Sequence, residues 1–279
     1  MKKDYIISAP FSSLSLLSCI FIIVLSTTSN YLRHNYPFRL IHFLSLIQAM
    51  IYLNRLFPAQ FLNDQVFCTI QGIVEQIFTF TRALWIGYMS FEMYNVVIRN
   101  KEKLYFGYYK PLAIFVLLGI LTSILPFLLK VEYKESGAWC WIKIENEDDI
   151  NGLILEIFMF YGLFWVIVFF CGFAAFKVSR QLKKHLGQDG NKFMVRKIQL
   201  YPVAMIIMYL PITCCRLLDC KIDYLNYISS SILSLNGLAN VIIFGCTDEV
   251  KERILRIFKT TNVDQSERSL NSSISFIRS

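Results

Sequence analysis

The sequence has few charged residues for its length. Asp, Glu, Lys and Arg make up 17% of its 279 residues, whereas about a quarter of a soluble domain is usually charged. The charges that are present gather in short segments and leave long stretches with none. This pattern argues against an ordinary soluble domain and favours helices that lie in lipid.

Histidine is also scarce, and the last long uncharged stretch has no lysine. The three histidines are His34, His42 and His185, and no ligand cluster forms around them, which argues against a membrane metal hydrolase. Residues 224–247 contain no lysine, so a retinal Schiff base as in microbial rhodopsins is excluded. We therefore expect neither an enzyme nor a bound cofactor.

Seven uncharged or mostly apolar stretches are present, and a helix needs about 20 apolar residues to cross the hydrocarbon core. The second is free of charges up to Asn54 and continues past Arg55, and the third carries three charges. The stretches are residues 5–32, 40–57, 66–98, 111–129, 157–176, 198–215 and 224–247. Buried helices of a large soluble protein would need polar covering elements, which the short linkers do not supply. The sequence predicts an all-α seven-transmembrane bundle.

The first stretch has an alternative interpretation as a signal peptide, because Lys2 and Lys3 precede an apolar run. The run is longer than a typical signal core, and no clear A-x-A cleavage site follows it. We favour a first membrane span.

The loops differ in basic charge, which predicts the orientation. One alternating set (residues 29–39, 99–110, 177–197 and the tail after Thr247) holds 19 Lys and Arg residues, and the other holds 8. Basic loops stay in the cytosol. We expect a multi-pass protein, in the plasma membrane, with its N-terminus outside and its C-terminus in the cytosol. The same bias explains the net charge of +8 without nucleic-acid binding.

Two cysteines lie where a disulfide is stable. Cys68 begins the third span and Cys140 lies in the next large outer loop between Trp139 and Trp141. Both face the oxidising side in the predicted orientation. A bond between them would tie the loop over the third helix, and Cys220 is a competing partner on the same side.

The order of several motifs carries a family resemblance. Seven spans, an outer N-terminus and a disulfide from the third helix to the second outer loop resemble a G-protein-coupled receptor. The third span has Glu92-x-Tyr94 in place of D-R-Y, and the seventh contains the run Asn236 to Gly245 without N-P-x-x-Y. Together with Cys140-Trp141 and the Arg196-to-Pro202 segment, these features resemble the slime-mould cyclic-AMP-receptor-like family and its secretin-like relatives.

The resemblance implies a receptor that transmits an extracellular small-molecule signal to a heterotrimeric G protein. Residues 1–259 would form the seven-helix domain with a short amphipathic eighth helix, in which Val250, Ile254, Ile257 and Phe258 share one face. Residues 260–279 would form a disordered Ser-rich tail. The large N-terminal hormone-binding domain of secretin-type receptors is not present in this sequence.

Ionisable residues inside spans indicate where a ligand binds, because such groups are costly in lipid and face the bundle interior. In one hypothesis, Arg55 and Arg82 line an outward cavity and hold an anionic ligand beside Glu75. The candidate ligand-binding residues are Arg55, Glu75, Arg82, Trp141, Glu156 and Arg216. In the alternative, Glu75, Arg82 and Glu156 pair with each other, while Arg55 and Arg216 extend to the interface.

The resemblance also implies an activation switch and an inner contact surface. His42 and Glu92 would form a polar lock of the resting state, and Pro202 and Pro211 would kink the sixth helix. The candidate switch residues are His42, Glu92, Tyr94, Pro202, Pro211 and Asn240. The candidate G-protein contacts are Lys177, Arg180, Lys183, Lys184 and Arg196.

A small polytopic transporter is the main alternative function. Transporters of this size usually contain internal repeats and broken helices near the midplane. The sequence shows no repeat, and its third span is long and unbroken, so a receptor is favoured.

Overall fold

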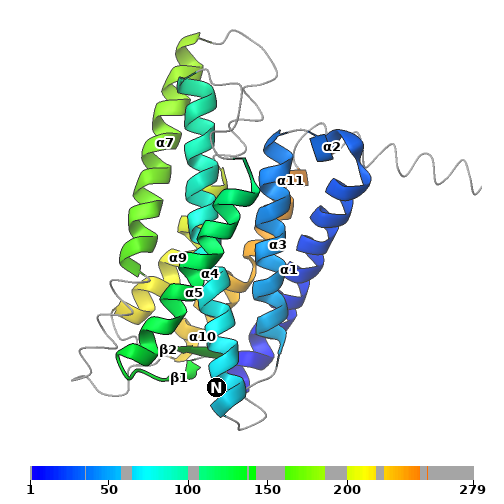
Figure 1. Ribbon diagram of the computed structural model, residues 1–279. Coiled ribbons are helices and arrows are strands. Elements are labelled where there is room, and N and C mark those ends of the chain that lie inside the picture. Colours follow the sequence, from blue (N-terminus) through cyan, green and yellow to red (C-terminus); the bar gives the residue numbers. More distant parts are fainter. Residues whose placement is uncertain are drawn as a thin grey trace, which may run out of the picture.

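The computed structural model describes residues 2–34, 36–57, 65–99, 107–136, 138–142, 161–185, 200–217, 223–245 and 250. Its helices and strands, in chain order, are α1 (Lys2–Thr28), α2 (Asn30–His34), α3 (Tyr36–Leu56), α4 (Gln65–Ile98), α5 (Tyr109–Leu128), β1 (Tyr133–Ser136), β2 (Trp139–Ile142), α7 (Leu163–His185), α9 (Leu200–Leu217), α10 (Asp223–Ser234) and α11 (Asn236–Gly245). Figure 1 shows the long helices side by side in one bundle.

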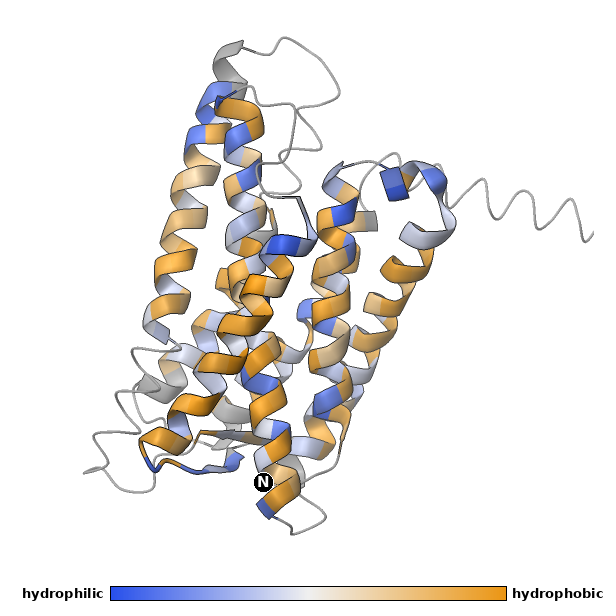
Figure 2. Cartoon of the chain, viewed as in Figure 1, coloured by the Kyte–Doolittle hydropathy of each residue, from blue (hydrophilic) through white to orange (hydrophobic). Residues whose placement is uncertain are grey.

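The elements form seven spans, as the apolar stretches predict. The helices α1, α3, α5 and α7 are each long and apolar enough to cross a membrane. The helix α4 is longer, at 34 residues or about 51 Å, and contacts α3, α5, α7 and the β1–β2 hairpin. Figure 2 shows hydrophobic residues along the helices and hydrophilic residues towards the ends of several of them.

Polar and apolar side chains are distributed as lipid solvation requires. Phe169 on α7 is 73% exposed and Phe176 is 63% exposed, on the outside of the bundle. In contrast, Arg55, Glu75 and Arg82 are each at most 3% exposed. Charges inside and large apolar side chains outside are the arrangement of an integral membrane protein.

The seventh span is divided, which the sequence did not indicate. The helix α10 ends at Ser234, and α11 begins two residues later at Asn236. At the break, the Leu235 N–H donates to both Ser231 O (3.2 Å) and Ile232 O (3.1 Å). The Ser15 hydroxyl of α1 donates to the Ser234 carbonyl, so α1 fixes the position of this break.

A close approach of α11 to α1 depends on Gly237. A Cβ at this position would lie 2.7 Å from the Ser15 carbonyl oxygen and 2.8 Å from Tyr52 Cε2. We expect Gly237→Ala to destabilise the protein by about 1–3 kcal/mol, because overpacking forces the backbone apart. The measurement is the apparent melting temperature of the purified protein in detergent.

Gly172→Ala is the matched control for this substitution. Gly172 lies within α7, and a Cβ there would meet nothing within 4 Å. This variant should melt at the wild-type temperature or above it, because alanine favours helix by up to about 1 kcal/mol. Equal melting temperatures for both variants would contradict the close approach.

The helix and strand boundaries bear on two expectations from the sequence and leave a third untested. The basic segment that begins at Lys177 is not a loop throughout, because α7 continues to His185. The large outer loop, which joins α5 to α7, contains an antiparallel hairpin in which Glu135 is paired with Cys140. Of the predicted eighth helix only Val250 lies among the described residues, in helical conformation, and the tail at 260–279 lies outside them.

Candidate ligand-binding site

The β1–β2 hairpin covers one end of the bundle and is bonded to α4. Cys68 and Cys140 form a disulfide with a Cα–Cα distance of 5.4 Å. This confirms the predicted pair; the competing partner Cys220 lies outside the described residues. The N-terminal end of α1 lies at the same end of the bundle as the hairpin (Figure 1), as expected if both face one side of the membrane.

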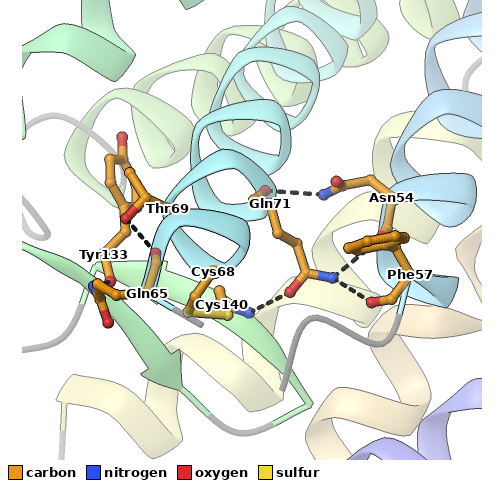
Figure 3. The surroundings of a disulfide bond; sticks show 8 residues. All are labelled: Asn54, Phe57, Gln65, Cys68, Thr69, Gln71, Tyr133 and Cys140. Atoms are coloured by element: carbon orange, nitrogen blue, oxygen red, sulfur yellow. Dashed lines mark hydrogen bonds between the residues drawn. A yellow bond between two sulfur atoms is a disulfide. The ribbon is translucent and has the colours of Figure 1, made fainter. Parts of the chain in front are cut away.

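Gln71 connects the hairpin to α3. Its Nε2 group donates to Asn54 O (2.9 Å) and Phe57 O (2.8 Å), and its Oε1 accepts from the Cys140 N–H (3.1 Å). Asn54 Nδ2 in turn donates to the Gln71 carbonyl at 3.0 Å. Figure 3 shows these bonds beside the disulfide. A single buried amide therefore fixes β2 relative to the end of α3.

Tyr133 anchors the other strand. Its hydroxyl donates to Ser123 O (3.0 Å), and its carbonyl accepts from Gln65 Nε2 (2.6 Å). Burial raises the pKa of the Tyr133 hydroxyl, so this donor stays protonated near neutral pH. The ring lies on α4 where a Cβ at Gly72 would be only 2.4 Å from Tyr133 Cδ1. Both strands of the hairpin are therefore held on α4.

We expect the Cys68→Ser/Cys140→Ser variant to be less stable than the wild type by about 2–5 kcal/mol, because the crosslink that restricts the unfolded chain is lost. The measurement is the apparent melting temperature without reductant. Cys171→Ser is the control, since Cys171 is a free cysteine of α7. A disulfide variant that melts no lower than this control would contradict a stabilising crosslink.

Arg55 and Glu75 form a buried ion pair beneath the hairpin. Arg55 Nη2 lies 2.6 Å and Nε 2.8 Å from Glu75 Oε1. Glu75 also accepts from Asn54 Nδ2 (3.2 Å) and Thr79 Oγ1 (3.3 Å). One hypothesis from the sequence expected Arg55 to extend to the membrane interface. The ion pair shows instead that Arg55 stays inside the bundle. The buried carboxylate from α4 lies close enough to hold it inside.

Two tryptophans of the hairpin form the roof of this region. The Arg55 guanidinium carbon lies 3.9 Å from the centroid of the Trp139 ring, in a cation–π contact. Trp139 and Trp141 are each 4% exposed. With Arg55 and Glu75, they line a cavity of about 30 Å³. That volume accommodates one or two water molecules, so a metabolite enters only if the roof or a wall moves.

Arg82 lies deeper in the bundle and has no ion-pair partner among the described residues. It is fully buried, and none of its three guanidinium nitrogens has a hydrogen-bond partner there. The predicted pairing with Glu75 is therefore wrong. Seven helical residues separate the two by about 10 Å along the axis, and Glu75 bonds instead to the nearer Arg55.

Tyr209 separates Arg82 from the cavity. The Arg82 guanidinium carbon lies 5.1 Å from the centroid of the Tyr209 ring, and this ring also lines the cavity. On α7, Phe164 packs on Tyr209 with ring centroids 4.3 Å apart. Because Tyr209 belongs to α9, a shift of that helix would change the path from the cavity to Arg82.

A polar network links three helices near Arg82. Asn240 Nδ2 of α11 donates to Gln48 Oε1 of α3, and Cys19 Sγ of α1 lies 3.8 Å from the same oxygen. The Gly237 N–H donates to the Tyr52 hydroxyl at 2.7 Å. The predicted switch residue Asn240 is thus buried and bonded between helices.

The predicted lock between His42 and Glu92 is not formed. His42 Nδ1 lies 2.6 Å from Ser26 Oγ of α1. Glu92 Oε2 accepts a long hydrogen bond of 3.5 Å from the Tyr36 hydroxyl. Different partners hold the two residues, because Tyr36 at the start of α3 occupies the position beside the carboxylate. Tyr94, two residues further along α4, is half-buried.

Several other predicted residues are described only in part or not at all. Pro211 lies inside α9, and Pro202 lies in its first turn. Lys177 contacts the Phe173 ring at 5.5 Å, and Arg180 is exposed on α7. Glu156 and Arg196 lie outside the described residues, as do the side chains of Lys183, Lys184, Pro202 and Arg216.

Sequence patterns did not indicate the uncharged polar residues that complete the site. Their amides and hydroxyls carry no charge, so they do not stand out in an apolar stretch as an ionisable side chain does. Such polar groups are costly in lipid and are usually bonded between helices. The missed residues are Gln48, Tyr52, Asn54, Gln71 and Tyr209.

The chain is similar in sequence to one known protein and in fold to another. No protein-family model matches the chain. The chain is 23% identical over 265 residues to "G-protein coupled receptor 1" of Arabidopsis thaliana, covering 87% of this chain and 78% of the relative. It is similar to the crystal structure of squid rhodopsin, with a TM-score of 0.72 and 18% identity, over 93% of this chain and 85% of the other. The chain therefore has a seven-helix fold similar to that of squid rhodopsin, as suits an integral membrane protein, and its sequence is similar to that of a plant protein named as a G-protein-coupled receptor.

Proposed function

We propose that the protein is a plasma-membrane receptor that binds a small anionic ligand beneath the β1–β2 hairpin and activates a heterotrimeric G protein. Its N-terminus and hairpin face outward, and its C-terminus lies in the cytosol. The observation that carries the proposal is the buried guanidinium of Arg82, whose nitrogens have no hydrogen-bond partner among the described residues.

The energetics of Arg82 support an anionic ligand. A buried cation without a partner is destabilised by several kcal/mol, at an order of magnitude. A carboxylate or phosphate that reaches the guanidinium would offset this cost through charge-assisted hydrogen bonds. Arg55 is less available, because Glu75 neutralises it. Arg82 is therefore the group that selects an anion.

The position of Tyr209 supports a route from ligand to helix movement. An anion at Arg82 would displace the Tyr209 ring from the guanidinium, and Tyr209 lies two residues before Pro211. Proline lacks a backbone donor, so α9 is weakened at that point. Displacement of the ring would favour the conformation in which the inner end of α9 has moved.

The inner end supplies basic side chains for the G protein. Lys177 and Arg180 on α7 are exposed. Together with Lys183, Lys184 and Arg196, they would flank the cleft opened by α9 and bind the C-terminal helix of a Gα subunit. An eighth helix up to residue 259 and a disordered tail at 260–279 complete the proposed domain organisation.

Guanine-nucleotide exchange is the direct test. Membranes that contain the receptor and a G protein would be screened with cyclic AMP, which the family resemblance suggests, and with small carboxylates and phosphates. Exchange stimulated by one of these anions is the expected result. Uptake of labelled anion into receptor vesicles without any exchange would favour a transporter instead.

Glu92 offers a test of the resting state. We expect Glu92→Gln to raise basal nucleotide exchange, because the buried carboxylate loses its charge and its bond from Tyr36 weakens. Tyr36→Phe, which removes the donor, should shift basal exchange in the same direction. Glu132→Gln in the outer turn is the control. Basal exchange at the wild-type rate in well-expressed Glu92→Gln would contradict this role.

A further inference from the structure

A second cavity lies at the end of the bundle opposite the hairpin. Its volume is about 440 Å³, and it is lined by the C-terminal part of α1, by α2, by the start of α3 and by the start of α5. This volume falls within the range of small-molecule sites, about 300–1,000 Å³. The proposed ligand site beneath the hairpin is separate from it and includes none of its residues.

The polar side of this cavity is basic. Arg33 and Arg39 both line it, together with His42, and no acidic side chain is among the described residues that line it. Two guanidinium groups on one cavity wall repel each other and attract an anion. Arg33 is exposed and Arg39 is half-buried, so a ligand can reach both.

Arg39 is held in place before any ligand binds. Its Nε donates to the Arg33 carbonyl, and its guanidinium carbon lies 5.3 Å from the centroid of the Tyr108 ring. The Tyr108 ring is itself stacked on Phe43, with centroids 5.9 Å apart. A cation fixed in this way loses little conformational entropy when it binds, which strengthens binding.

The remaining walls of the cavity are apolar. Leu32, Phe38 and Phe43 line it beside the two arginines. A free inorganic anion would gain nothing from these side chains, whereas a lipid would place its phosphate at the arginines and the start of its acyl chains along them. Basic pockets between transmembrane helices at the cytosolic surface suit phosphorylated headgroups.

We propose that this cavity binds the phosphorylated headgroup of an anionic phospholipid of the inner leaflet, with Arg33 and Arg39 as the phosphate ligands. The ligand chemistry is a phosphate monoester or diester. The leaflet follows from the proposed orientation, but the binding does not depend on G-protein coupling. The site and the receptor function are therefore tested by different measurements.

The experiment measures lipid binding to the full-length protein in phosphatidylcholine nanodiscs. Fluorescent phosphatidylinositol bisphosphate is titrated, and energy transfer from a dye attached to the protein is recorded. Arg39→Gln and Arg33→Gln are compared with the control Arg99→Gln. Arg99 is an exposed residue just after α4 that does not line the cavity. Size-exclusion elution establishes that each variant is folded.

The wild type and Arg99→Gln should bind the lipid equally well. Arg39→Gln and Arg33→Gln should each weaken binding by about tenfold or more, because one charge-assisted contact is lost. Soluble inositol phosphate is added as a competitor. If it displaces the fluorescent lipid at a concentration equal to that of the lipid, the ligand is a free phosphate ester and the lipid assignment is overturned. No saturable binding, or equal weakening in Arg99→Gln, would overturn the site.

Discussion

Glu75→Gln is expected to destabilise the folded protein by about 3–5 kcal/mol, because it leaves the Arg55 guanidinium buried without its counter-ion. The wild-type pair is held by two short hydrogen bonds, and both side chains are almost completely buried. The desolvation of Arg55 would then be uncompensated. The measurement is the temperature at which half of the protein remains monodisperse after heating in detergent.

An exposed ion pair in the same protein supplies the control. Lys134 and Glu132 are 3.0 Å apart, with side chains 30% and 67% exposed. Exposed pairs contribute about 0–1 kcal/mol, so Glu132→Gln should leave the melting temperature almost unchanged. If Glu75→Gln and Glu132→Gln lowered it equally, the buried pair would have no special role.

The double variant Arg55→Leu/Glu75→Leu separates pairing from burial. Removing both charges eliminates the uncompensated cation, and such replacements of buried pairs are often neutral or stabilising. We therefore expect the double variant to be more stable than Glu75→Gln. If the destabilisation of the double variant equalled the sum of those of Arg55→Leu and Glu75→Leu, the two residues would not be coupled.

Arg82→Met is expected to separate stability from signalling. Removal of an unpartnered buried cation should leave the melting temperature unchanged or raise it. The same change should lower the potency of an anionic agonist by about 100-fold or more, since two charge-assisted hydrogen bonds are lost. The measurements are thermal stability and agonist-stimulated nucleotide exchange on the same preparation.

Two further variants sharpen the Arg82 experiment. Arg82→Lys keeps the charge but loses the planar fork, so we expect an intermediate potency. Gln76→Met replaces another buried polar residue of α4, which does not line the cavity, and its potency should equal that of the wild type. A fully responsive Arg82→Met would refute recognition of the agonist by this guanidinium. Strong destabilisation by Arg82→Met would refute the absence of a hydrogen-bond partner for Arg82.

The membrane spans and the disulfide pair could be predicted from the sequence. Apolar runs of about 20 residues predicted the spans, because unpaired backbone groups are too costly in lipid and force helix formation. The Cys68–Cys140 pair was found because both residues fell in outer segments of the predicted topology. Helix boundaries differed by a few residues, and the break at Leu235 carried no clear signal.

The partners of buried polar groups could not be read from spacing alone. Glu75 and Arg82 share one face of α4, yet Glu75 bonds to Arg55 of a neighbouring helix and Arg82 contacts Tyr209. Likewise, His42 bonds to Ser26, while Glu92 accepts from Tyr36. These choices depend on how neighbouring helices are rotated and shifted against each other.

The sequence by itself determined that the chain folds as a seven-helix bundle in lipid, because solvent alone decides which segments become spanning helices. Only the tertiary structure decided that Arg55 is neutralised, that Arg82 has no hydrogen-bond partner among the described residues and that Arg39 lies against the Tyr108 ring at the opposite end. The physical reason is that ion pairs and cation–π contacts are made only within a few ångströms. Distances of that size are set by helix packing and not by the order of residues along the chain.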